Sequence, residues 1–105
     1  MKTPGLRSEE VAMLQDVFRR HSEIKVVKLF GSRAKGNHAT SSDIDLALWG
    51  NVTALEAESI AAELDELPLP YRYDVKPFHL IELLPLREHI ERVGITVFSG
   101  DSEAN

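Results

Sequence analysis

The segment 43–49 constrains the fold more than any other part of this chain, because its side chains alternate in character. Successive side chains of a β-strand point to opposite faces of the sheet. In this segment Ile44, Leu46 and Leu48 therefore share one face, whereas Asp43 and Asp45 share the other with a small residue, Ala47. The pattern predicts a half-buried strand that carries two carboxylates side by side on its less apolar face.

Further elements follow from hydrophobic spacing and from helix and turn signals along the chain. Ser8 is a candidate N-cap for the first helix, and the spacing Thr53-Ala54-Leu55-Glu56 is that of a capping box. Gly31 ends one apolar run, and Pro68 with Pro70 stops another. The expected elements are a helix over 9–21, a strand over 25–30, a loop over 31–42, the strand over 43–49, a helix over 54–67, a strand over 71–76, a helix through Leu86, Ile90 and Val93, and a strand over 95–98.

This element order predicts a mixed β-sheet of about four strands flanked by helices, in the α/β to α+β class. With 105 residues, the chain is expected to form a single domain over 1–105, with a disordered polar tail at about 100–105. No second domain is expected, so any further substrate-binding surface would have to come from another chain. The sequence does not predict the order of the strands.

The composition limits which metal ions and which kinds of partner the chain is expected to bind. The chain has no cysteine, so a metal ion would have to bind oxygen or imidazole ligands, which favours a hard cation. Its net charge of -5 opposes a general affinity for phosphate backbones, so nucleic acid is not an expected partner. No apolar run is long enough to span a bilayer and the N-terminus is charged, which favours a cytoplasmic protein without a membrane partner.

The paired aspartates point to metal chemistry. On a strand, the backbones of Asp43 and Asp45 lie about 6 to 7 Å apart, and their repulsion costs on the order of 2 to 3 kcal/mol. Magnesium or manganese offsets such a cost, because these ions bind carboxylate and phosphate oxygens together. Asp74 lies on the polar face of the strand over 71–76 and adds a third carboxylate if the two strands are neighbours. Three carboxylates are the donor set that a two-ion site needs.

A structural interpretation of the same aspartates stays open. Asp43 and Asp45 can be turn residues at the start of a strand, with Asp43 accepting hydrogen bonds from backbone amides. Asp74 lies between Arg72 and Lys76 on one face, so it can equally belong to an exposed row of ion pairs.

The residues before these aspartates are suited to phosphate binding. Gly31 directly after a strand lets the backbone approach a ligand, and Ser32 offers a hydroxyl and an amide to a phosphate oxygen. Arg33 and Lys35 follow closely enough to steady the phosphates, and two other roles stay open for them, as solvated loop charges or as counterions of the aspartates.

The full string from Gly31-Ser32-Arg33-Ala34-Lys35-Gly36 to Ser42-Asp43-Ile44-Asp45-Leu46 resembles the motif of the polymerase-β-like nucleotidyltransferase superfamily, in the form typical of its minimal nucleotidyltransferase family. The resemblance covers nearly the whole chain. It implies that Gly31 and Ser32 hold the triphosphate of ATP, that Asp43 and Asp45 bind two magnesium ions, with manganese as an alternative, and that Asp74 is the third ligand.

The resemblance also implies a partner and a reaction. Minimal nucleotidyltransferases of this size pair with a helical HEPN-domain RNase toxin and act as its antitoxin by adenylylating a tyrosine on it, in HEPN/MNT toxin–antitoxin pairs. The expected assembly is therefore a hetero-oligomer. Two alternatives stay open: an inactive antitoxin that neutralises its partner by binding alone, and transfer of the nucleotide to a small molecule.

The remaining candidate residues favour structural roles. The four histidines are scattered without metal-ligand spacing, and we expect them at the surface or at helix ends. The large aromatic residues of the strands are expected to pack rather than to stack on a base. These residues are His21, His38, His79, His89, Trp49, Tyr71 and Tyr73.

Overall fold

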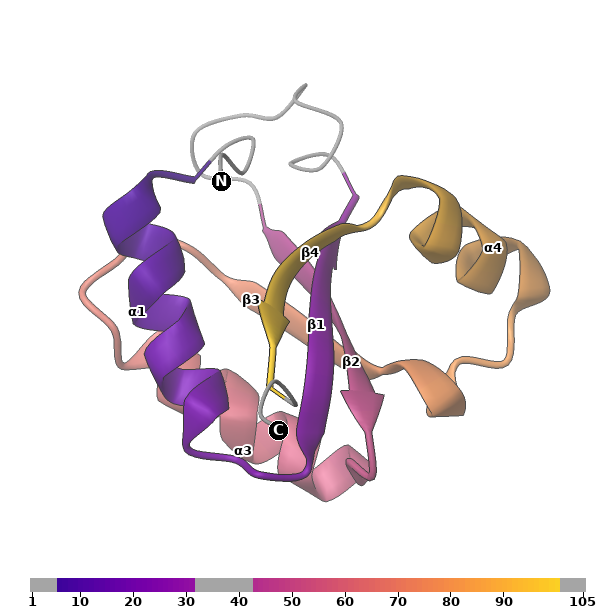
Figure 1. Ribbon diagram of the computed structural model, residues 1–105, viewed down its shortest axis with the longest axis horizontal. Coiled ribbons are helices and arrows are strands. Elements are labelled where there is room, and N and C mark those ends of the chain that lie inside the picture. Colours follow the sequence, from indigo (N-terminus) through magenta and orange to yellow (C-terminus); the bar gives the residue numbers. More distant parts are fainter. Residues whose placement is uncertain (1–5, 32–42, 101–105) are drawn as a thin grey trace.

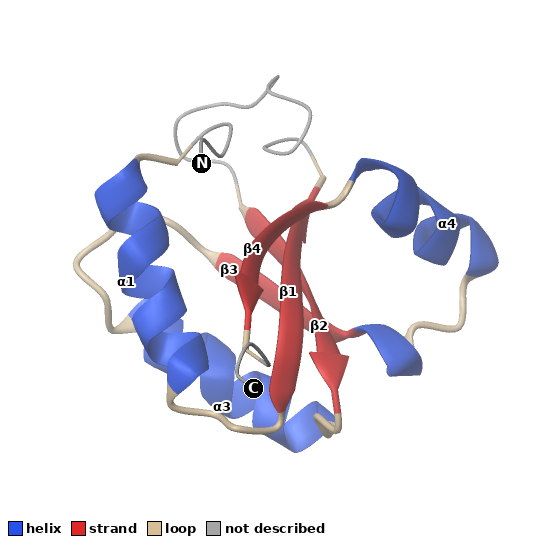
Figure 2. Cartoon of the chain, in the orientation of Figure 1, coloured by secondary structure: helices blue, strands red, loops and turns tan. Residues whose placement is uncertain are grey.

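The computed structural model describes residues 6–31 and 43–100 of the chain. Within these residues the chain forms a sheet with helices on both faces (Figures 1 and 2). The elements are α1 (Ser8–Arg19), β1 (Ile24–Phe30), β2 (Ile44–Gly50), α3 (Ala54–Asp65), β3 (Tyr73–Pro77), the 3-10 helix η1 (Phe78–Leu80), α4 (Leu84–Val93) and β4 (Ile95–Ser99).

The four strands pair in the order β3-β2-β1-β4. Strand β1 pairs antiparallel with both β2 and β4, whereas β2 and β3 are parallel. A parallel pair needs a crossover connection, which α3 supplies between β2 and β3. The sheet is therefore mixed, and the predicted α/β to α+β class with about four strands is confirmed.

The main core lies between the sheet and the helices α1 and α3, which cover the same face (Figure 1). The apolar alternation of β2 and β3 determines this face, because every second side chain points toward the two helices. Burial of each large apolar side chain stabilises the fold by about 1.5 to 3 kcal/mol. The fully buried members include Leu14, Val17, Phe18, Val27, Leu29, Ile44, Leu46, Leu48, Ile60 and Leu64.

A smaller core covers the other face, beneath α4 and η1 (Figure 2). It contains Phe30 and Ala47 from the sheet, together with Phe78, Ile81 and Ile90. Trp49 stacks on the Phe78 ring with 4.4 Å between centroids, and Tyr71 and Tyr73 pack against the main core. The prediction that Trp49, Tyr71 and Tyr73 serve packing is confirmed.

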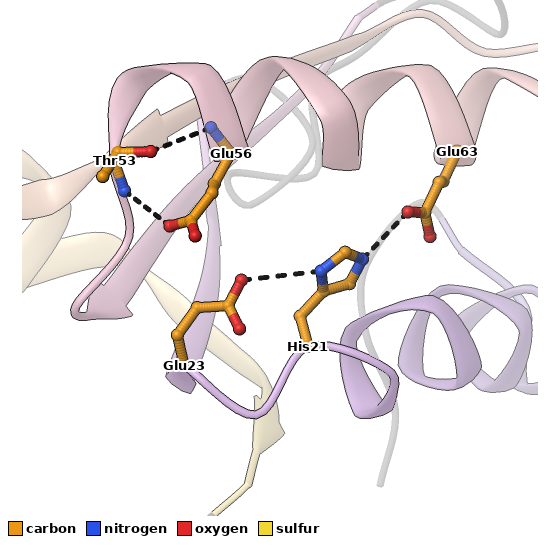
Figure 3. Close-up of polar contacts among 5 residues, drawn as sticks. All are labelled: His21, Glu23, Thr53, Glu56 and Glu63. Carbon is orange, nitrogen blue, oxygen red and sulfur yellow. Dashed lines mark hydrogen bonds and ion pairs between the residues drawn. The ribbon is translucent and has the colours of Figure 1, made fainter.

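Most predicted elements are present, with shifted ends. The capping box at α3 is confirmed, because Thr53 Oγ1 accepts a hydrogen bond from the Glu56 amide and Glu56 Oε1 accepts one from the Thr53 amide, each at 3.0 Å (Figure 3). The predicted helix over 9–21 ends at Arg19, and the strand predicted over 71–76 begins at Tyr73.

The prediction that Ser8 caps the first helix is wrong. Ser8 is the first helical residue, and Arg7 is the N-cap. The Glu10 carboxylate accepts a hydrogen bond from the Arg7 amide at 3.1 Å and also accepts one from the Tyr71 hydroxyl at 3.1 Å. Glu10 is only 5% exposed, and its carboxylate satisfies the Arg7 amide, which a Ser8 cap would leave free. The helix therefore begins one residue earlier than predicted.

A polar contact joins the end of α1 to α3. The imidazole of His21 lies 3.0 Å from a Glu63 carboxylate oxygen and 3.5 Å from one of Glu23 (Figure 3). His21 is thus a helix-end residue, as predicted, and it lies at the opposite end of β1 from Gly31. His79 is exposed and His89 is partly buried.

None of the helices in the described part of the chain, the longest of which have 12 residues, has the length and apolar character needed to cross a membrane.

Candidate active site

Two of the three predicted acids lie side by side at one end of the sheet. In the parallel pairing of β2 with β3, Asp45 is directly opposite Asp74. Neighbouring strands lie about 4.8 Å apart, so the two carboxylates share one environment. Asp43 is exposed and directly precedes β2 on the chain. Sequence analysis could bring Asp74 to the other two acids only if its strand was the neighbour of β2. The structure meets this condition, because β2 and β3 are paired.

Gly31 lies at the same end of the sheet, directly after β1, which flanks β2 on the side opposite to β3. Strand β1 runs antiparallel to β2 and places Phe30 opposite Asp45, so the chain leaves the sheet directly beside that aspartate. Gly31 has a φ of +82°, which L side chains rarely adopt. A Cβ atom at this position would lie 2.3 Å from Asp45 Oδ2, too close for any real contact. The backbone conformation therefore favours glycine, and any side chain at this position would have to displace the Asp45 carboxylate.

Burial and neighbouring charges act on Asp45 together. Burial raises the pKa of the Asp45 carboxyl above its ordinary value of 3.8, and the negative charges of Asp74 and Asp43 raise it further, whereas the Lys76 ammonium lowers it. Both other acids therefore interact with Asp45. Such an arrangement disfavours the ionised carboxylate unless a positive charge is added, which is the electrostatic condition of a cation site.

Asp74 already has a positively charged neighbour. The Lys76 ammonium lies 2.5 Å from Asp74 Oδ2, in an ion pair between two residues on the same face of β3. The other candidate partner from the sequence, Arg72, forms no ion pair with a described residue, and its carbonyl accepts a hydrogen bond from the Ile44 amide at 2.8 Å. The predicted row of ion pairs is thus reduced to one pair.

The predicted site residues divide into two groups. The structure places Gly31, Asp45 and Asp74 together, and Asp43 lies two positions before Asp45 on the chain. The other predicted phosphate-binding residues lie outside the described part of the chain, and so does His38. These phosphate-binding residues are Ser32, Arg33 and Lys35. Among residues 6–31 and 43–100, no group of three or more His, Asp or Glu side chains is arranged to hold a metal ion. The three-carboxylate metal site therefore stays a prediction.

The donor chemistry fits magnesium. Asp43, Asp45 and Asp74 offer only oxygen ligands, which magnesium prefers over nitrogen or sulfur. The raised pKa of Asp45 indicates that added positive charge would be favourable there. A cavity of about 500 Å³ lies elsewhere, between the end of α1 and β4, and no carboxylate lines it.

Comparison with known proteins identifies the fold family. Residues 12–103 match the family described as polymerase beta, nucleotidyltransferase. The chain belongs to this nucleotidyltransferase family. A search among curated proteins finds no significant match.

Solved structures share the fold of this chain. A chain in a toxin–antitoxin crystallised with AMP-PNP is 18% identical with a TM-score of 0.72, over 93% of this chain and 77% of that one. A chain in the toxin–antitoxin MntA–HepT is 16% identical with a TM-score of 0.68, over 89% and 73%. A chain in a complex of tri-AMPylated Shewanella oneidensis HEPN toxin with MNT antitoxin is 15% identical with a TM-score of 0.70, over 90% and 73%. At these identities the likeness shows the fold.

Sequence reasoning missed two polar features near the site. It did not predict that Lys76 rather than Arg72 pairs with Asp74, because both flank the aspartate on the same face. It also missed the buried contact between Glu10 and Tyr71, which are 61 residues apart. The one available signal was the position of Glu10 in the first helical turn, which indicates a capping role but no distant partner.

Proposed function

We propose that this chain is a magnesium-dependent nucleotidyltransferase that transfers AMP from ATP to a hydroxyl group, most simply that of a tyrosine, on a HEPN RNase toxin. By this modification it acts as the antitoxin of its partner. The observation that carries the proposal is the juxtaposition of Gly31, Asp45 and Asp74 at one end of a sheet with the nucleotidyltransferase fold.

Each residue of the site has a role in this proposal. Asp43 and Asp45 hold two magnesium ions, and Asp74 is the third carboxylate ligand. A bound ion supplies charge neutralisation for the triphosphate and the reacting oxygens. Gly31 leaves room for the Asp45 carboxylate and lets the backbone approach phosphate oxygens, and Ser32, with Arg33 and Lys35, steadies the triphosphate.

The reaction itself needs little covalent chemistry from the protein. The acceptor hydroxyl oxygen forms a bond to the α-phosphorus of ATP, the bond from that phosphorus to the pyrophosphate oxygen breaks, and the hydroxyl proton leaves to a carboxylate or to solvent. Catalysis consists of positioning and of stabilising the developing negative charge. This requirement matches a site built from acids and a close backbone turn.

Support for the partner comes from the structures with the same fold. Their descriptions name toxin–antitoxin complexes, a bound ATP analogue and a tri-AMPylated HEPN toxin. These are properties of those proteins, and we extend them to this chain because it shares their fold and its own motif resembles that of the minimal nucleotidyltransferase family.

A second function has a specific observation in its favour. Asp74 is paired with Lys76, and no three-residue metal group is formed among the described residues. An antitoxin that neutralises its toxin by association alone would keep this pair, because it would not need Asp74 as a metal ligand.

The decisive experiment measures transfer directly. The purified chain, incubated with ATP labelled in its α-phosphate, magnesium and a HEPN protein encoded beside it, should label that protein. Asp43→Ala and Asp45→Ala should each lower labelling by about 100-fold or more, because each removes a metal ligand. The control Asp65→Ala removes an exposed aspartate at the end of α3 and should label normally.

The outcome separates the two functions. Labelling that persists in both Asp43→Ala and Asp45→Ala contradicts the metal assignment. If the double variant transfers nothing yet protects cells from the toxin as well as the native chain does, neutralisation by binding alone replaces the enzymatic function.

A further inference from the structure

We use the term acid cluster for Asp43, Asp45 and Asp74. Among the basic side chains of the described residues, Lys76 is the one that the structure places in contact with this cluster. Its ammonium lies 2.5 Å from Asp74 Oδ2, and it also acts on Asp45, whose pKa it lowers. It follows Asp74 by two positions on β3, so both side chains point to the same face of the sheet. The cluster therefore contains a cation that belongs to the chain itself.

The register explains why this lysine reaches the acids. Lys76 is opposite Ala47, two positions beyond the pair formed by Asp45 and Asp74. Farther along the same face lies the apolar cluster that includes Trp49 and Phe78. Because Ala47 has a small side chain, the lysine stem can lie along the sheet, with the ammonium at the acids rather than in the apolar cluster.

The pair can be broken at small cost. The Lys76 side chain is 37% exposed and that of Asp74 is 48% exposed. Ion pairs with such exposure are weak, because water screens them and ordering two side chains costs entropy. A divalent ion carries twice the charge of the ammonium and would bind several carboxylates at once.

We propose that Lys76 is a built-in counterion of the acid cluster, which holds Asp74 while the site is empty and which a divalent cation must displace. This inference rests on the proposed function, since it takes Asp74 as a metal ligand. Lys76 is a positioning residue in this role. Its charge limits repulsion among the three aspartates in the metal-free protein and raises the cation concentration at which the site fills.

The test is a manganese titration of the full chain, without nucleotide or partner, read by the electron paramagnetic resonance of free manganese. Lys76→Met should bind manganese about three- to tenfold more tightly than the native chain, because a competing positive charge has been removed. Lys76→Arg, which keeps the charge, should bind within about twofold of the native chain. Circular dichroism confirms that each variant is folded.

A matched control separates a local effect from net charge. Lys25→Met removes the same charge from an exposed position at the opposite end of β1 from Gly31, and should change affinity less than about twofold. Unchanged or weaker binding in Lys76→Met, or equal tightening in Lys25→Met, overturns the inference.

Failure of the proposed function gives a different result. In that case the native chain binds no manganese, or Asp45→Asn binds it as well as the native chain does. If binding requires Asp45 but is insensitive to Lys76, the metal site stands and only the counterion role is wrong.

Discussion

At the scale of single residues, the candidate site depends on a close contact between a glycine and a carboxylate. The positive φ of Gly31 turns the chain out of β1, and its missing side chain leaves the volume that the Asp45 carboxylate occupies. Sequence analysis explained Gly31 by the close approach of a phosphate group to the backbone. The structure adds a second reason for glycine at this position, which is the space that the Asp45 carboxylate occupies.

Gly31→Ala should destabilise the protein and disturb the site. The positive φ alone costs about 1 to 2 kcal/mol for an L residue, and the added Cβ, 2.3 Å from Asp45 Oδ2, must displace that side chain. Urea unfolding measures the cost. In an Asp45→Ala background the penalty should be smaller, because the displaced carboxylate is gone. Additive effects of the two substitutions would contradict the contact.

Asp45 should make stability depend on pH in metal-free buffer. Burial first, and then the charges of Asp74 and Asp43, raise its pKa in the folded protein above 3.8, with Lys76 opposing them. The folded state therefore binds the proton more tightly than the unfolded state, and stability falls as pH rises from about 3.8 through the raised folded value.

Asp45→Asn removes this loss, so above that pH range the variant should be more stable than the native chain in urea unfolding with EDTA present. Below pH 3.8 the difference should disappear. An Asn variant that is less stable at neutral pH would show that the carboxylate is stabilised in the fold rather than strained by it.

At the scale of elements, α3 holds the two acid-bearing strands together, because it connects β2 to β3 and packs on the main core. Its first turn is fixed by the reciprocal hydrogen bonds between Thr53 and Glu56 (Figure 3). Its other end contacts His21 through Glu63.

Thr53→Ala should lower the free energy of unfolding by about 1 kcal/mol, because the Glu56 amide loses its acceptor. Thr53→Ser keeps the hydroxyl and should lose much less. AMP transfer should be unchanged in both, because the cap lies after the end of β2 far from Asp45, which is near its start. A loss of transfer at constant stability would contradict this separation.

At the scale of the whole molecule, the predictions that succeeded rest on local periodicity. Alternation within 43–49 and 71–76 determined which side chains face the helices, since the period of a strand is fixed by its geometry. The order of the strands, the choice of Lys76 over Arg72 and the burial of Glu10 against Tyr71 depend on contacts between distant segments. No local pattern contains that information, and the Ser8 cap was wrong for the same reason.

The parallel pairing of β2 and β3 makes this chemistry sensitive to the register of the two strands. Asp45 and Asp74 meet because the register of the two strands pairs them directly. One inserted residue that shifted the pairing by a single position would rotate Asp74 to the face covered by α3, with every acid still present in the sequence. An insertion within β3 (Tyr73–Pro77) would therefore need a compensating bulge to keep the two acids together, whereas an insertion in the connection before β3 would only lengthen that connection.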